Sequence, residues 1–68
     1  MTKEEVAFYN AYTATRIEQE LKGVVNVKPE QVRAKMQNIS QNDFNSLLSG
    51  MASSHLLCVL DGAVWWNE

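Results

Sequence analysis

The stretch EQVRAKMQNISQNDFNSL, residues 30–47, organises the middle of the chain, because it holds one helix, a turn and the start of another helix. The KPE tripeptide at residues 28–30 opens the first helix, since proline is preorganised at a first helical position. Asn38 adopts a positive φ at modest cost and so can end that helix. Ser40 is a good N-cap for the next helix, with Asp43 three residues later. We therefore expect two short helices joined by a tight turn.

A longer helix is predicted ahead of this unit, over residues 3–21. Thr2 and Glu5 have the spacing of a capping box, and Gly23 can take the left-handed conformation that ends a helix. An apolar stripe at helical spacing runs along this segment and consists of Val6, Tyr9, Thr13, Ile17 and Leu21. A second, partly apolar face holds Phe8, Ala11, Tyr12 and Thr15. The β-branched VVNV at residues 24–27 predicts a short strand.

Two apolar runs close the chain, LLCVL at residues 56–60 and AVWW at residues 63–66, on either side of Asp61-Gly62. A two-residue Asp-Gly turn between apolar runs is the strongest short-range signal for a β-hairpin. Strand alternation puts Leu57, Val59, Val64 and Trp66 on one face and Cys58, Leu60, Ala63 and Trp65 on the other. Both faces are apolar, which favours contact with a partner.

A competing interpretation continues the third helix through residue 60 and gives an all-α three-helix bundle. Helical spacing is kept by Phe44, Leu47, Leu48, Met51, His55 and Val59. Gly50, the pair Ser53-Ser54 and the paired tryptophans after a glycine turn argue against it.

The two-helix unit resembles the helix-turn-helix family. Counting from Glu30, a small residue stands fifth and aliphatic or aromatic residues stand tenth, fifteenth and eighteenth, namely Ala34, Ile39, Phe44 and Leu47. Asn38 stands ninth, where the family usually has glycine. With the first helix, the short strand and the hairpin, nearly the whole chain resembles the winged helix-turn-helix DNA-binding proteins. The resemblance implies one domain over residues 1–68, α+β and mainly α, with Ala34 buried where the two short helices cross.

In winged-helix proteins the third helix usually enters the major groove of double-stranded DNA. The resemblance implies base contacts from the outward residues of this helix, which are Gln41, Asn42, Asn45, Ser46 and Ser49. Amide side chains can bond adenine, and serine can bond a base edge or a phosphate. Phosphate contacts would come from Lys28, Arg33 and Lys35. The same polar residues equally fit an ordinary solvated helix face.

The charge distribution leaves two functions open. The net charge is −2, and residues 37–68 carry three acids with no Lys or Arg. Phosphate attraction supplies much of the affinity for DNA, so the acidic second half weakens that interpretation. The leading hypothesis, which the resemblance implies, is a small DNA-binding transcriptional regulator that acts as a homodimer. The alternative is a winged-helix protein-interaction module, an inhibitor or adaptor that binds a protein partner and not DNA.

Self-association is expected as reinforcement for so short a chain. A domain of 68 residues sits near the lower limit for folding alone, and the single Cys58 excludes an internal disulfide. Cys58, His55 and the scattered acids provide no four-ligand zinc set. We therefore expect a homodimer, with its interface among Phe8, Tyr12, Trp65 and Trp66.

The sequence offers little for catalysis. His55 and Cys58 do not form the nucleophile, base and orienting group that a thiol enzyme needs, and there is no glycine-rich phosphate loop or HExxH motif. We expect neither an enzyme nor a bound cofactor or metal. No run of eighteen apolar residues occurs and the N-terminus lacks the order of a secretion signal, so we expect a cytoplasmic protein that does not bind membranes.

Overall fold

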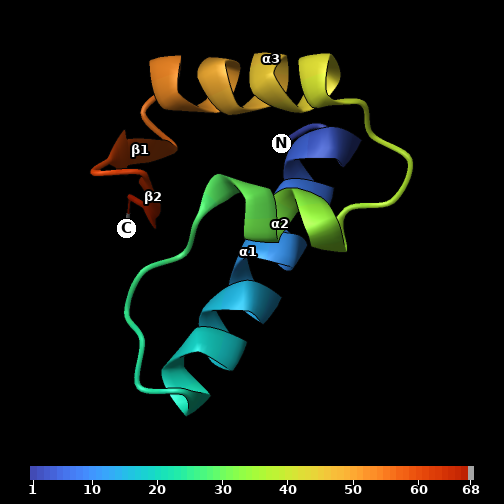
Figure 1. Ribbon diagram of the computed structural model, residues 1–68. Helices are drawn as coiled ribbons and strands as arrows, with labels where there is room; N and C mark the ends of the chain where they lie inside the picture. The colour runs from blue at the N-terminus through green and yellow to red at the C-terminus, as the bar shows by residue number, and fades with distance from the viewer. Residues whose placement is uncertain (68) are drawn as a thin grey trace.

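The computed structural model describes residues 1–67. These residues form α1 (Lys3–Leu21), α2 (Pro29–Lys35), α3 (Gln41–Ser53), β1 (Leu57–Leu60) and β2 (Ala63–Trp66), so the class is α+β and mainly α. In Figure 1, α3 lies across the top, α1 runs away below it, α2 lies against α1, and the hairpin follows the end of α3. The most extensive contacts are those between α1 and α2 and those between the two strands.

Local signals place the ends of α1 where the sequence predicts them. The Thr2 hydroxyl accepts a hydrogen bond from the Glu5 backbone N–H at 3.2 Å, and the Glu5 carboxylate accepts one from the Thr2 N–H at 2.8 Å. This reciprocal pair satisfies two backbone donors that the helix start would otherwise leave open. At the other end Gly23 has φ +76°, the left-handed conformation expected of it.

The buried side of α1 differs from the predicted stripe. The residues of α1 that face the core are Phe8, Ala11, Tyr12 and Thr15, whereas Val6, Tyr9, Ile17 and Leu21 are exposed. The two aromatic rings of the first set carry a large apolar area into the core. Its two small residues let α2 approach closely, because a close-packed contact between helices leaves little room for larger side chains. The second apolar face is therefore the core face.

The strand predicted at residues 24–27 does not form. That segment is extended, and the Val64 backbone N–H donates a 2.7 Å hydrogen bond to the Val27 carbonyl, but within residues 1–67 the sheet consists of β1 and β2. Pro29 follows almost at once, has no N–H to donate to a ladder, and starts α2. The segment is therefore joined to the hairpin by the hydrogen bond between Val27 and Val64.

The turn between α2 and α3 is confirmed, but the expected crossing of the two helices is wrong. Asn38 has φ +56°, and the Ser40 hydroxyl accepts a 3.1 Å hydrogen bond from the Asp43 backbone N–H. Ala34, however, is exposed. The seven-residue α2 packs chiefly on α1, and the ring of Phe44 on α3 stacks on the ring of Phe8 on α1.

The hairpin is confirmed with its predicted turn, and the all-α alternative is wrong. Leu60 pairs with Ala63 around Asp61-Gly62, whose φ angles of +53° and +73° fit the type I′ turn that suits twisted strands. α3 ends at Ser53, and His55 has φ +62°, which no continuing right-handed helix allows.

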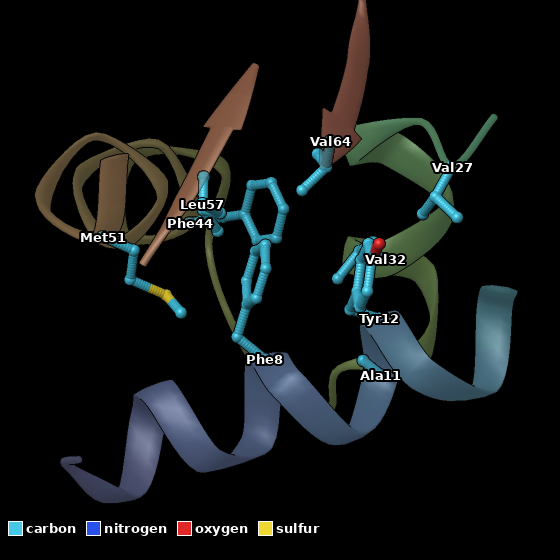
Figure 2. Close-up of a cluster of buried hydrophobic side chains, with 9 residues drawn as sticks. All are labelled: Phe8, Ala11, Tyr12, Val27, Val32, Phe44, Met51, Leu57 and Val64. Carbon is cyan, nitrogen blue, oxygen red and sulfur yellow. The ribbon is translucent and has the colours of Figure 1, made fainter. Parts of the chain in front are cut away.

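One apolar core joins all these elements. Figure 2 shows Phe8 rising from α1 toward Phe44 of α3, with Met51 on one side and Val32 of α2 on the other. The rings of Phe8 and Phe44 are stacked with their centroids 5.7 Å apart. The buried apolar cluster comprises Phe8, Ala11, Tyr12, Val27, Val32, Phe44, Met51, Leu57 and Val64.

Candidate interaction surfaces

The outer face of α3 is polar and uncharged. The five predicted base-contact residues, Gln41, Asn42, Asn45, Ser46 and Ser49, are all exposed, opposite the buried Phe44 and Met51. The Gln41 amide donates a 2.8 Å hydrogen bond to the side-chain oxygen of Asn45. The fold therefore brings these residues onto one face, and two of its amides bind each other.

The three predicted phosphate contacts have different surroundings. Arg33 donates a 3.3 Å hydrogen bond to the Ile39 carbonyl, and its buried Nε atom has no hydrogen-bond partner among the described residues. Arg33 is thus turned inward at the α2–α3 turn. Lys35 forms an ion pair with Glu18 of α1. Lys28 is exposed at the start of α2.

The ion pair between Lys35 and Glu18 ties the end of α2 to the last turns of α1. The hydrogen bond from Lys35, followed by its positive charge, holds the pKa of the Glu18 carboxyl below its usual range. A cleft of about 290 Å³ lies here, lined by Thr15, Glu18, Gln19, Lys22, Gln31, Ala34 and Lys35. This end of α1 points away from α3 in Figure 1.

Two of the four predicted interface residues are inside the protomer. Phe8 is completely buried and Tyr12 is only 5% exposed. Their rings fill the core, so in this fold they have no surface to offer a partner. The prediction that they form an interface is corrected on that ground.

The two tryptophans point to opposite sides of the hairpin. Trp66 is half-buried: its ring lies edge-on to Tyr9 with centroids 4.7 Å apart, and its backbone N–H donates a 3.4 Å hydrogen bond to the Tyr12 hydroxyl. Trp65 lies directly across from Cys58 on the other face and is 38% exposed. Of the predicted interface residues, Trp65 offers the most surface to a partner.

The exposed residues around Trp65 form what we call the outer hairpin face, which consists of Cys58, Leu60 and Trp65. Strand alternation puts the three on one side of the sheet, and all are exposed, Leu60 by 62%. A cleft of about 390 Å³ lies beside the contact between the hairpin and α1 and is lined by Tyr12, Arg16, Glu20, Val25, Trp65 and Trp66. The α1 side of this cleft carries an ion pair between Arg16 and Glu20 at 3.1 Å.

A further exposed surface was missed from sequence. It is the apolar stripe of α1. The sequence distinguishes this stripe from the second apolar face of the helix, but it does not show which of the two faces is buried. The sequence feature that distinguishes the buried face of α1 from the exposed face is the distribution of side-chain sizes. On the core face two large rings, Phe8 and Tyr12, alternate with the small Ala11 and Thr15, which combines a large buried apolar area with room for close packing.

Within residues 1–67, no group of three or more His, Cys, Asp and Glu side chains is placed to hold a metal ion. The helices of the same residues include none of the length and apolarity needed to cross a bilayer. The order of three helices and an antiparallel hairpin is compatible with a winged-helix-like fold. No protein-family model, curated protein or solved structure matches the chain.

Proposed function

We propose that this chain is a small winged-helix-like protein-interaction module, which binds a protein partner through the outer hairpin face. The observation that carries the proposal is the exposure of Cys58, Leu60 and Trp65 on one side of a two-stranded sheet. An antiparallel sheet that is covered on one face usually shows polar residues on the other. Exposed apolar groups gathered on one face are typical of a binding surface.

The charges favour a protein partner over a nucleic acid. From residue 36 onward the chain has no Lys or Arg, so α3 and the hairpin supply no fixed cation to a phosphate backbone. Arg33 is held by the Ile39 carbonyl and Lys35 by Glu18. Docking on DNA requires cations that neutralise phosphates, and freeing these two would first cost their present contacts.

DNA binding is retained as a second candidate because of the outer face of α3. Asn and Gln there have the donor and acceptor pair that reads adenine in the major groove, and all five predicted base-contact residues are accessible. A dimer that used three cations per subunit would show a slope of about −5 when the logarithm of its DNA affinity is plotted against the logarithm of the salt concentration.

The first experiment places a photo-crosslinking amino acid at Leu60 in the cells that make the protein. A discrete adduct with one other protein is expected at Leu60. The control position is the exposed Glu4 of α1, where no such adduct is expected. An adduct pattern that is the same at both positions, or an adduct of two copies of this chain at Leu60, would overturn the proposal.

The second experiment decides between the two candidates. Fluorescent duplex DNA is titrated with the intact protein at low salt, where electrostatic binding is strongest. We expect no saturable binding. Two results together would favour the regulator and refute the interaction module. DNA binding would be weakened by Asn45→Ala, and its affinity would fall with salt as steeply as a dimer with six cations requires.

A further inference from the structure

The two edges of the hairpin differ in the partners of their backbone groups. In an antiparallel pair of strands, residues that exchange hydrogen bonds alternate with residues whose N–H and C=O groups point outward. The Val64 N–H donates to the Val27 carbonyl, and the Trp66 N–H donates to the Tyr12 hydroxyl. These outward groups of β2 are therefore bonded to the segment before α2 and to α1, which cover that edge of the sheet.

The edge of β1 has an open position at Val59. Val59 pairs with Val64, so its own N–H and C=O also point away from the ladder, on the opposite edge. Within residues 1–67, none of the backbone hydrogen bonds outside the ladder involves Val59. Val59 is 45% exposed, and its neighbours Cys58 and Leu60 are exposed as well. β1 also contains neither a charged residue nor a proline, the residues with which proteins commonly protect a sheet edge.

We infer that an extended segment of the protein partner adds to the edge of β1 as a third strand centred on Val59. This inference rests on the proposed function, because it states how the partner reaches the outer hairpin face. Strand addition to a sheet edge is a recurring way to recognise a peptide, with affinity from main-chain hydrogen bonds and specificity from alternate side chains. An antiparallel segment suits an edge this short, because one of its residues bonds both open groups of Val59.

The outer hairpin face sets the side chains that the segment needs. Side chains alternate along a strand, so the two partner residues on either side of the one that bonds Val59 lie beside Cys58 and Leu60. Both positions should be apolar, because they cover exposed apolar groups. The segment is therefore expected to carry apolar residues two positions apart.

The charge at the end of β1 adds a further requirement. Asp61 is the one charged residue between residues 56 and 67, and it is exposed in the turn. The two ion pairs described above lie on α1 and α2, so neither of them uses this carboxylate. A Lys or Arg at the end of the segment that passes Asp61 would complement it. A second β1 offers no cation there, so the edge fits a different protein better than another copy of this chain.

The first test removes the open donor and follows the photo-crosslinked adduct at Leu60. Val59→Pro deletes the N–H and leaves the bonds between β1 and β2 in place, because this N–H points outward. Val59→Thr is the matched control, since it keeps the N–H and the β-branched shape. The adduct with the partner should fall at least about tenfold in Val59→Pro and stay near the wild-type level in Val59→Thr. Circular dichroism checks that both variants are folded.

The outcomes separate this inference from the proposed function. A partner adduct that is equally strong in Val59→Pro and in the wild type would overturn the strand addition and leave the interaction module standing. A wild type without a partner adduct at Leu60 would refute both. Asp61→Asn removes the charge and keeps a residue that accepts the turn, and it should weaken the adduct; an unchanged adduct would contradict the cation in the segment.

A second measurement does not depend on how well Val59→Pro folds. The crosslinked segment of the partner is identified by mass spectrometry and added, as a synthetic peptide, to the wild-type protein. Amide exchange at Val59 should become at least about tenfold slower when the peptide binds, whereas exchange at Ala34 on α2 should not change. Binding without slower exchange at Val59 would overturn the third strand.

Discussion

Replacing Phe8 by leucine tests which side of α1 belongs to the core. Phe8 is fully buried, and its ring stacks on Phe44 at 5.7 Å. Loss of the ring contact costs about 0.5–1.5 kcal/mol. A void of roughly 30 Å³ left by the smaller side chain adds about 0.7 kcal/mol. We therefore expect the free energy of unfolding to fall by about 1–2 kcal/mol.

The matched comparison is Ile17→Ala on the opposite side of the same helix. Ile17 is 55% exposed, so in the monomer this change should cost no more than about 0.5 kcal/mol. Total stability for a chain of this length is about 3–10 kcal/mol, which leaves both variants folded. Urea denaturation at the lowest workable protein concentration, followed by tryptophan fluorescence, measures both. If Ile17→Ala destabilises the monomer as much as Phe8→Leu, the assignment of the core face is refuted.

Three further predictions concern charge, backbone and packing. Because the pKa of the Glu18 carboxyl is lowered, its contact with Lys35 stabilises the fold above pH 4.5, the ordinary pKa of this group. This stabilisation is lost as the pH falls through the lowered pKa. Glu18→Gln should therefore flatten this part of an acid-unfolding curve, and an unchanged curve would contradict the prediction. His55→Gly should raise the free energy of unfolding by about 0.5–1 kcal/mol, because His55 occupies φ +62°; a lower midpoint in urea would show that its side chain matters more than its backbone. Ala34→Leu should change the melting temperature little, because Ala34 is exposed; a loss of about 1–3 kcal/mol would instead indicate a tight helix crossing.

The sequence by itself determined the features that depend on near neighbours in the chain. The capping box at Thr2 and Glu5, the cap at Ser40, the positive φ of Asn38 and the Asp61-Gly62 turn are all present as predicted. Each involves groups no more than three residues apart. Their geometry is fixed by backbone sterics and local hydrogen bonds, so it does not depend on how the elements pack.

Only the tertiary structure decided which of two apolar sides of α1 is buried and which cations remain accessible. Both sides of α1 satisfy helical periodicity, and the choice depends on how well α2 and Phe44 fit against rings and small residues. Likewise, the sequence around Lys35 does not indicate that Glu18 is its partner. Glu18 is seventeen residues away and becomes the ion-pair partner of Lys35 when α2 packs on α1. These outcomes depend on packing between segments distant in the chain, and the pattern along a single element does not contain that information.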